Sequence, residues 1–375
     1  MNKLILLSAI VLVSFQNSPC QDTINANWKW NKDIESYVLR PRDVLIEPLI
    51  INDIIFFNGS LYPYNITNGK VLKYEEENSL KLIKENCRDS LVLFNENYMV
   101  FLVNIYNGKI LLELSRKIGL KYPLITQPKI VNRGYCAFQK NDTAIVCYDY
   151  IKGTERWNYS IPRGKKEFLY MEPLQVNDTV IIATGKKIIC CDANSGKPLF
   201  EIPLNSRLSG NMLVSDTDLY YVTAEDDCVH AFSMTKKKET WKFACVEDSK
   251  DFCGGGMSCK IFIQNDVLYF ANGILAAMNK NSGEIIWKNS SSCISFLYTS
   301  QCIFTNKFII TSERADDEYP LACFDKTTGK KIGYSFGVAL FGESNTYSPK
   351  HNLFININRK EGVSMKVNAW QLTND

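Results

Sequence analysis

A short residue pattern recurs along this chain at nearly constant intervals, and this repetition limits the fold more strongly than any other feature of the sequence. Its clearest copy runs from Ala277 to Trp287 and reads Ala-Met-Asn-Lys-Asn-Ser-Gly-Glu-Ile-Ile-Trp. A glycine anchors six copies and a lysine anchors a seventh: Gly69, Gly108, Gly153, Gly196, Lys237, Gly283 and Gly329. Successive anchors are 39, 45, 43, 41, 46 and 46 residues apart. Each interval is therefore expected to be one structural unit.

The residues around each anchor predict a tight turn between two β-strands. Four positions before the anchor, every copy has a short polar residue: Asn65, Asn104, Asp149, Asp192, Ser233, Asn279 and Asp325. Such a side chain accepts hydrogen bonds from nearby backbone amides, and glycine adopts the positive φ that closes the turn. Four positions after the anchor, five of the seven copies have a large apolar residue: Leu112, Trp157, Phe200, Trp241 and Trp287. Alternating apolar residues on both sides predict strands.

A second turn signal lies 16 to 18 residues before three of the anchors, at Asp53, Asp178 and Asp266. Each of these residues follows an asparagine and precedes a strand-like run such as Val267–Phe270. Two hairpins in one repeat describe a four-stranded antiparallel sheet, which is one blade of a β-propeller. The fold class predicted is therefore all-β.

The length of the chain predicts eight blades in a single domain over residues 21–375, with seven blades as the alternative. Near the C-terminus, Ala369-Trp370-Gln371 resembles the strand that enters an eighth repeat. The outer strand of that repeat is expected to come from the N-terminus, where Asn27-Trp28-Lys29-Trp30 resembles the end of a repeat. Two termini that share one blade would leave no broken sheet edge in the ring.

The first 20 residues predict a secretory signal peptide, and therefore a periplasmic, cell-surface or secreted protein. A lysine at position 3 precedes an apolar run from Leu4 to Phe15, which is too short for a stable membrane anchor. Ser18-Pro19-Cys20 supplies the small residues that signal peptidase requires before a cut. Two alternatives are a lipoprotein anchored through an acylated Cys20, which would be the only membrane attachment, and an uncleaved N-terminus.

Without Cys20, twelve cysteines remain, an even number that favours disulfides in an exported chain. Three pairs are suggested by hairpin symmetry or by a flexible glycine-rich loop: Cys136–Cys147, Cys228–Cys245 and Cys253–Cys259. A zinc site is not expected, because no paired Cys-x-x-Cys or His-x-x-x-His motif is present. The disulfide pattern as a whole stays open.

Charge and motifs exclude several function classes. The chain has 43 Lys and Arg against 40 Asp and Glu, and this balance does not predict nucleic-acid binding. The two histidines, His230 and His351, are expected to be ordinary surface or satisfied side chains rather than members of a catalytic Ser-His-Asp or Cys-His set. Gly254-Gly255-Gly256 lacks the Lys-Ser/Thr ending of a phosphate-binding loop. We therefore expect a protein that is not an enzyme.

The repeat resembles that of the pyrroloquinoline-quinone-like β-propellers, over roughly residues 27 to 371. The resemblance is carried by Ala277, Asn279, Ser282, Gly283 and Trp287, and more loosely by the copy around Gly329. In that family the motif is structural, because the tryptophan of one blade wedges against the turn of a neighbouring blade. The residues to which it assigns this structural role are Asp149, Gly153, Trp157, Asp192, Gly196, Trp241, Asn279, Gly283, Trp287, Asp325 and Gly329.

The family contains two functional types. The large quinoprotein dehydrogenases hold the quinone and calcium in the central channel, whereas a compact single-propeller type resembles an outer-membrane assembly lipoprotein that binds other proteins. This chain is only slightly longer than eight bare blades. The resemblance therefore implies an assembly scaffold with an unidentified protein partner and without a cofactor.

Three other interpretations stay open. Cys190-Cys191 could form the vicinal disulfide that quinoprotein dehydrogenases place against their cofactor, although each residue also fits a strand position. Two acidic groups could bind calcium or a basic partner on one face, or could be solvated turns: Glu225-Asp226-Asp227 and Asp316-Asp317-Glu318. The basic run Lys236-Lys237-Lys238 is likewise expected to be a solvated turn. A face that binds a ligand or a glycan is compatible with the repeat. Six N-glycosylation sequons, which would be glycan sites in a eukaryotic source and carry no meaning in a bacterial one, begin at Asn58, Asn65, Asn141, Asn158, Asn177 and Asn289.

Overall fold

In the computed structural model, every regular element among the described residues is a β-strand. The structure describes residues 26–35, 49–51, 53–56, 64–71, 91–96, 99–104, 110–113, 129–130, 135–141, 144–149, 152–160, 173–224, 228–244, 259–294, 302–312, 321–334, 344–359 and 364–372. Within these ranges, no helix is long and apolar enough to cross a membrane.

The described strands form eight antiparallel sheets, five with four strands and three with three. Three of the four-stranded sheets consist of consecutive strands. The first contains β12 (Leu174–Val176), β13 (Thr179–Ala183), β14 (Lys187–Asp192) and β15 (Pro198–Pro203), and the second contains β16 (Leu213–Ser215), β17 (Asp218–Thr223), β18 (Cys228–Ser233) and β19 (Lys238–Ala244). The third contains β23 (Ile303–Phe304), β24 (Phe308–Ser312), β25 (Leu321–Asp325) and β26 (Lys331–Tyr334). The three-stranded sheets are β2 (Leu49–Ile51), β3 (Ile54–Phe56) and β4 (Tyr64–Asn65); β9 (Tyr135–Asn141), β10 (Ala144–Asp149) and β11 (Thr154–Ser160); and β20 (Lys260–Gln264), β21 (Val267–Asn279) and β22 (Ile285–Ile294).

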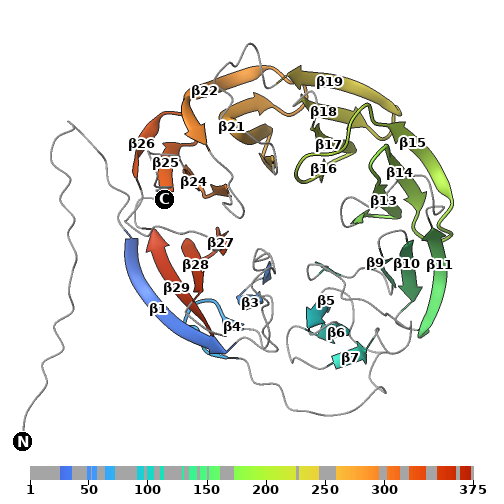
Figure 1. Ribbon diagram of the computed structural model, residues 1–375, viewed down its shortest axis with the longest axis horizontal. Helices are drawn as coiled ribbons and strands as arrows, with labels where there is room; N and C mark the ends of the chain where they lie inside the picture. The colour runs from blue at the N-terminus through green and yellow to red at the C-terminus, as the bar shows by residue number, and fades with distance from the viewer. Residues whose placement is uncertain are drawn as a thin grey trace, which may run out of the picture.

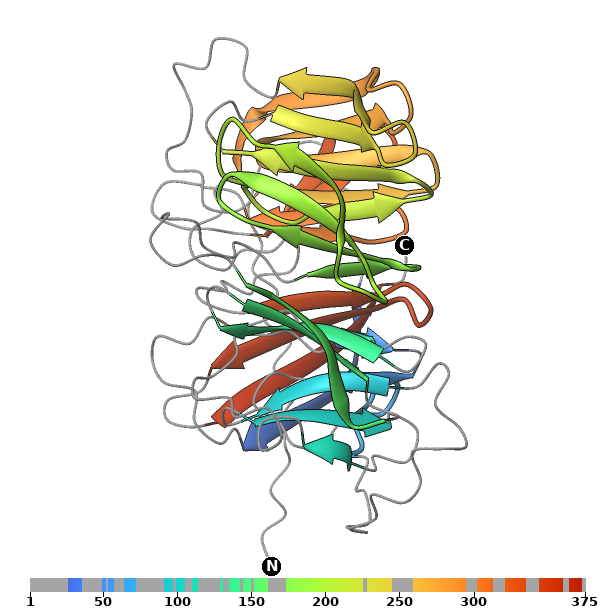
Figure 2. The same cartoon turned by 90° about the vertical axis from the view of Figure 1, so that its right-hand side faces the viewer.

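The sheets lie around a common centre, and their outer strands, such as β1, β11, β15 and β19, form the rim (Figure 1). Seen from the side, the strands of each sheet run between the two faces of the ring (Figure 2). The chain is therefore a β-propeller, as the repeat predicts.

One sheet combines the two ends of the chain. It contains β1 (Ala26–Glu35), β29 (Ser364–Leu372), β28 (Leu353–Arg359) and β27 (Ser344–Ser348), in that order. β1 is antiparallel to β29, with Trp28 opposite Trp370. The N-terminal strand thus lies at the outer edge of the C-terminal sheet.

The sheet of β5 (Leu91–Glu96), β6 (Met99–Asn104) and β7 (Ile110–Glu113) departs from the expected sequence order. Its fourth strand is β8 (Lys129–Ile130), which follows β7 in the chain but pairs with β5 at the other edge. β8 comes directly before β9 in the chain but does not join the β9–β11 sheet. By pairing with β5, it provides hydrogen-bond partners for an edge that would otherwise be open.

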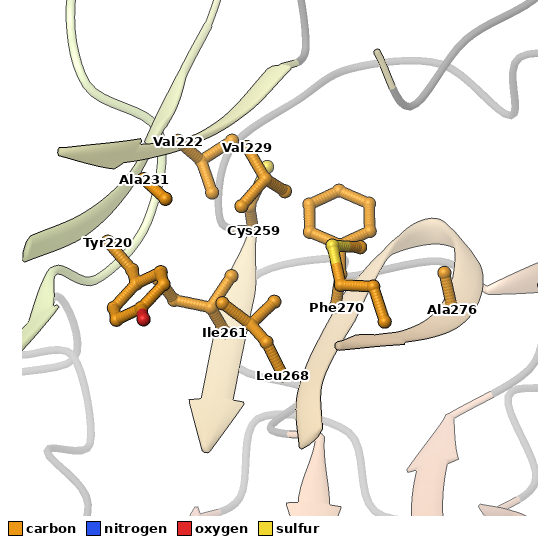
Figure 3. Packing of buried hydrophobic residues seen from close by; sticks show 10 residues of the cluster. Tyr220, Val222, Val229, Ala231, Cys259, Ile261, Leu268, Phe270 and Ala276 are labelled. Carbon is orange, nitrogen blue, oxygen red and sulfur yellow. The ribbon is translucent and has the colours of Figure 1, made fainter. Parts of the chain in front are cut away.

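The hydrophobic core lies between neighbouring sheets. Between the β16–β19 and β20–β22 sheets, the buried residues that pack together are Tyr220, Val222, Val229, Ala231, Cys259, Ile261, Leu268, Phe270, Ala276 and Met278 (Figure 3). Alternate residues of β18 pack in opposite directions: Val229 and Ala231 belong to this cluster, whereas Phe232 packs toward the β12–β15 sheet. This alternation explains why the inner strands are apolar on both faces.

A β-bulge recurs between the two strands that the repeated turn connects, such as β21 and β22. The register shifts lie between Leu102/Val103, Cys147/Tyr148, Cys190/Cys191, Ala231/Phe232, Ala277/Met278 and Cys323/Phe324. In each pair, the residue three positions after the anchor is the extra one, such as Ile286 after Gly283. A bulge re-aims the side chains that follow it and twists the edge strand. The repeat pattern alone did not predict this feature.

The proposed disulfide between Cys136 and Cys147 is wrong. Cys147 lies opposite Ala137, and Cys136 lies opposite Tyr148. A register shift at Ala144 moves the hairpin by one residue, so the two cysteines lie on opposite faces of the sheet. Cys147 is a buried free thiol.

The other two cysteine pairs stay predictions. Cys228 lies opposite Ala244 at the end of β19, and Cys259 is buried at the start of the β20–β22 sheet. Their proposed partners, Cys245 and Cys253, lie outside the described residues.

Candidate functional site

The repeated turn has the same backbone geometry in each described copy. The anchor amide donates a hydrogen bond to the carbonyl oxygen four residues earlier at Gly69, Gly153, Gly196, Gly283 and Gly329, with N–O distances of 2.8 to 2.9 Å. These glycines have φ angles between 66° and 72°, and Lys237 has a φ of 51° in the degenerate copy. The anchor position therefore needs a left-handed backbone, which glycine adopts without a steric penalty.

The short polar residue that begins each turn accepts hydrogen bonds from the next two or three residues of the same turn. Asp192 Oδ1 accepts bonds from Ser195 N at 2.7 Å, Ser195 Oγ at 2.8 Å and Asn194 N at 3.1 Å. These bonds from Ser195 lower the pKa of Asp192, because they stabilise its charged form. Asn279 and Asp325 accept bonds from their own turns in the same way.

The tryptophan of one sheet packs against the turn of the next sheet. Trp157 Nε1 donates to Ala193 O at 2.8 Å, Trp241 Nε1 to Lys280 O at 2.8 Å, and Trp287 Nε1 to Lys326 O at 3.1 Å. The rings also lie against the anchor glycines that follow them. A Cβ atom would lie 2.6 Å from the Trp157 ring at Gly196, 2.7 Å from the Trp241 ring at Gly283 and 2.3 Å from the Trp287 ring at Gly329.

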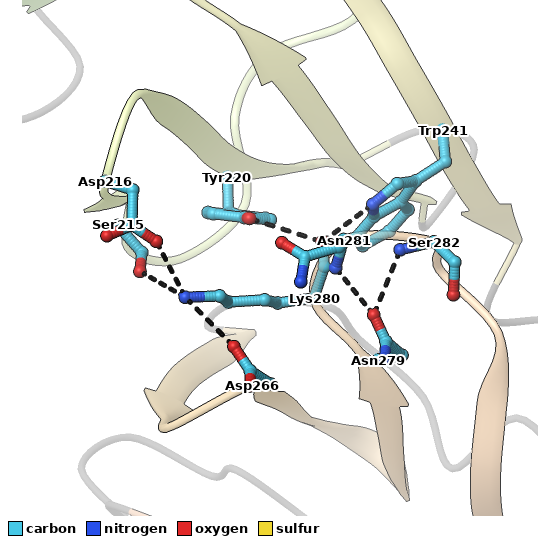
Figure 4. Close-up of polar contacts among 9 residues, drawn as sticks. All are labelled: Ser215, Asp216, Tyr220, Trp241, Asp266, Asn279, Lys280, Asn281 and Ser282. Carbon is cyan, nitrogen blue, oxygen red and sulfur yellow. Dashed lines mark hydrogen bonds and ion pairs between the residues drawn. The ribbon is translucent and has the colours of Figure 1, made fainter.

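Lys280 joins two sheets through a nearly buried ammonium group (Figure 4). Its Nζ lies 2.8 Å from Asp216 Oδ2, 3.5 Å from Asp266 Oδ1 and 3.2 Å from Ser215 Oγ. Asp216 belongs to the β16–β17 turn and Asp266 to the β20–β21 turn, and residue 280 as a whole is 8% exposed. The hydrogen bond with Asp216 raises the pKa of Lys280 and lowers that of Asp216. The charged pair thus holds the two turns together.

Lys326 has the same repeat position in the next sheet but different partners. Its Nζ donates to the carbonyl oxygens of Thr305 and Asn306 and lies 5.8 Å and 5.5 Å from the ring centres of Phe262 and Tyr269. Sequence reasoning missed both lysines, because Asp216 and the rings of Phe262 and Tyr269 reach them from a neighbouring sheet. The available signal is a lysine directly after the short polar residue of the turn.

His230 lies between a hydroxyl group and a carboxylate. Its Nε2 is 2.7 Å from Thr223 Oγ1, its Nδ1 is 2.7 Å from Glu239 Oε2, and its ring stacks on Tyr221. This order of groups matches a nucleophile, a base and an orienting acid. However, Thr223 is only 3% exposed, so its hydroxyl group is closed to a substrate. The arrangement is that of a histidine satisfied within the sheet.

His351 contacts the sheet at the other end of the sequence. Its Nε2 lies 2.9 Å from Asp53 Oδ1, and Lys350 Nζ lies 2.6 Å from the same oxygen. The hydrogen bond from Lys350 lowers the pKa of Asp53. The β27–β28 turn is therefore bound to the β2–β3 turn.

Cys190 and Cys191 pack in opposite directions from β14. Cys190 belongs to the core facing the β16–β19 sheet, and Cys191 belongs to the core facing the β9–β11 sheet. Both are fully buried, which raises the pKa of Cys190 to about 12 and that of Cys191 to about 11. Two thiols on opposite faces of a strand do not fit a vicinal disulfide that stacks on a quinone in the channel.

The remaining sequence candidates lie outside the described residues. They are Cys20, the acidic groups at 225–227 and 316–318, and the glycine-rich loop at 254–256. Among the residues that the structure does describe, no three His, Cys, Asp or Glu side chains gather in a way that could hold a metal ion.

The sequence matches the family model of the outer membrane protein assembly factor BamB over residues 20–243 and 141–293. The chain belongs to this family. The expected relation to the pyrroloquinoline-quinone-like repeat proteins is thereby confirmed. No curated protein matches the chain.

Solved structures share the fold at low sequence identity. BamB from Moraxella catarrhalis is 14% identical, with a TM-score of 0.57, over 92% of this chain and 100% of that one. The designed Ika8 protein is 12% identical, with a TM-score of 0.58, over 90% and 98%. A quinohemoprotein alcohol dehydrogenase from Pseudomonas putida is 9% identical, with a TM-score of 0.60, over 93% and 76%. One of the two natural proteins is named as a BamB protein and the other as an alcohol dehydrogenase, although they share one fold. The fold alone therefore does not assign a function.

Proposed function

We propose that this chain is an exported, non-enzymatic scaffold that holds other proteins of a cell-envelope assembly. The family match carries this proposal. The described repeat residues support it, because they form turns or contacts between sheets rather than a reactive centre. Export rests on the signal peptide that the sequence predicts at residues 1–20, and acylation of Cys20 is the alternative that would anchor the protein to a membrane.

The proposed scaffold is a closed ring of eight blades. Support comes from the sheet that contains both ends of the chain and from its contacts on both sides. Leu353 and Ile355 pack against Ile55 of the β2–β4 sheet, and Phe354 packs against Ile310 of the β23–β26 sheet. A seven-bladed ring would leave one of the eight described sheets outside it.

The scaffold is proposed to work without pyrroloquinoline quinone or calcium. The separation of Cys190 from Cys191 across β14 supports this, because the quinone interpretation needs both sulfur atoms on one side. Titration of the purified protein with the quinone plus calcium, followed by absorbance and calorimetry, tests it. We expect no saturable signal, whereas saturable binding together with alcohol oxidation would replace the scaffold by an oxidoreductase.

Site-specific photocrosslinking in the native cell tests the scaffold role. A photoreactive amino acid is placed singly at the exposed positions Asn194, Leu199 and Ile286 of the full chain. A scaffold predicts one discrete protein adduct that forms from at least one of these positions and is lost when chain without the photoreactive residue competes. Ultraviolet-independent adducts are the control. Adducts absent from every position, together with turnover by the purified chain, would contradict the proposal.

A further inference from the structure

The N-glycosylation sequons differ in structure: some have asparagine side chains exposed to solvent, and one has its side-chain amide in a hydrogen bond to a neighbouring sheet. It describes the side chains of four of the six sequon asparagines: Asn65, Asn158, Asn177 and Asn289. Asn158 and Asn177 are exposed, whereas Asn65 and Asn289 are half-buried. A glycan needs both an available amide and free space outside it.

Asn158 follows the wedge residue Trp157 on the outer strand β11. Because neighbouring strand residues point to opposite faces, its side chain points away from the contact that Trp157 makes with the next sheet. Ser160, the hydroxyl residue of the sequon, donates its Oγ hydrogen to Asn158 Oδ1 at 2.9 Å. The sequon is thus displayed on the rim, with its hydroxyl group beside its amide.

Asn177 lies in the two-residue turn between β12 and β13. Its φ is 51°, and the residues at this turn, Asn177 and Asp178, are exposed. A hairpin tip leaves space for a large polar substituent, and within the part of the chain that the structure describes no hydrogen bond uses the side-chain amide of this asparagine.

Asn289 lies two residues after Trp287 and therefore on the same face of β22. This face contacts the next sheet, where Asn289 Nδ2 donates to Gly329 O at 2.8 Å. A sugar on that nitrogen would lie against the same turn that receives the Trp287 ring. Asn65 Oδ1 is also engaged, because it accepts three hydrogen bonds within its turn.

We propose that Asn158 and Asn177 are acceptor sites for N-linked oligosaccharide and that Asn289 is not. In the reaction, the Asn Nδ2 forms a bond to the anomeric carbon of a lipid-linked oligosaccharide. The bond from that carbon to the pyrophosphate oxygen breaks, the lipid pyrophosphate leaves, and Nδ2 loses one proton to a base. The proposal rests on the proposed export, through a compartment that contains this glycan donor and its transferase.

Secretion of the full chain from insect cells tests both sites. One arm carries the chain's own residues 1–20 and a second arm carries a heterologous leader. Folded secreted protein is treated with peptide N-glycosidase in heavy-oxygen water, which marks each formerly glycosylated asparagine as aspartate, and its peptides are identified by mass spectrometry. We expect marks at Asn158 and Asn177 and none at Asn289. Ser160→Ala and Thr179→Ala should each remove one mark and leave the other.

Unmarked Asn158 and Asn177 in folded secreted protein, or a marked Asn289, would overturn the proposal. If the chain is secreted with the heterologous leader but not with its own residues 1–20, the result would instead contradict the export part of the proposed function. The glycan sites would still be decided by that second arm, so the two failures are distinguishable.

Discussion

At the scale of single residues, the wedge tryptophan joins one sheet to the next by a ring contact and a hydrogen bond. Trp157, Trp241 and Trp287 each direct Nε1 at the turn of the following sheet. The turn must have a bare Cα where the ring lies, which the anchor glycine provides. The tryptophan and the glycine of the neighbouring repeat are therefore one structural unit, although they are distant in sequence.

Trp287→Ala should lower the free energy of unfolding by about 3 to 5 kcal/mol, because it removes a large side chain from the contact between two sheets. Trp287→Phe keeps most of the ring and loses the bond to Lys326 O, so it should cost about 1 kcal/mol from that bond plus the smaller volume. Guanidinium titration followed by fluorescence measures both. A change below about 1 kcal/mol for the alanine variant would refute the wedge role.

Gly329→Ala should destabilise the protein by more than about 1 kcal/mol, since the new Cβ would lie 2.3 Å from the Trp287 ring at a φ of 69°. Gly185→Ala is the matched control, because no atom lies within 4 Å of its Cβ position and its φ is not in the left-handed region. Thermal unfolding of both variants compares them. Equal melting temperatures for the two would contradict the tight contact.

Cys147, Cys190 and Cys191 should resist thiol reagents in the folded protein. Burial raises the pKa of Cys147 and Cys190 to about 12 and that of Cys191 to about 11, so almost no reactive thiolate is present at pH 8. Labelling with iodoacetamide, followed by peptide mass spectrometry, should find these three unmodified until denaturant is added. Rapid labelling of any of them without denaturant would show that the core opens locally.

At the scale of elements, the turns and the strands were predictable because their signals are local. The polar residue and the anchor of each turn lie four residues apart, and the turn that they form needs no distant partner. The bulge before each wedge residue was not predictable, because it depends on register between two strands. The position of Lys280 was missed for a similar reason, since Asp216 becomes its neighbour only when two sheets pack together.

The turns should lose stability in acid. The pKa values of Asp53, Asp192 and Asp216 are lowered in the folded protein, so the unfolded chain binds more protons as pH falls through about 4. Their stabilisation is complete above that pH and is lost below it. Urea titrations at pH 7 and pH 3 should show the difference.

Asp192→Asn is the control for the acid effect, because asparagine keeps the acceptor, as at the equivalent Asn279, but does not titrate. This variant should lose less stability between pH 7 and pH 3 than the unmodified chain does. An identical loss would show that Asp192 does not contribute.

At the scale of the whole molecule, the sequence predicts where the two termini meet, because unmatched ends of a repeat are visible in the residues. β1 lies beside β29 in the position that the tryptophans near residues 28 and 370 suggest. The exchange of β8 between neighbouring sheets was not predicted, since the anchor spacing does not reveal which edge a short strand covers. The pairing of Cys136 with Cys147 shows the same limit, because symmetry about a turn fails when one residue is bulged.

The central claim is a ring closed by β1, and hydrogen exchange of the full-length protein tests it most directly. Amides in Ala26–Glu35 that bond to β29 should exchange slowly, and those in Ser364–Leu372 should match them, because the two strands share one ladder. Slow, matched exchange in both segments is the result that we expect. Exchange of residues 26–35 at the rate of an unstructured chain, while β28 and β29 stay protected, would contradict closure of the ring.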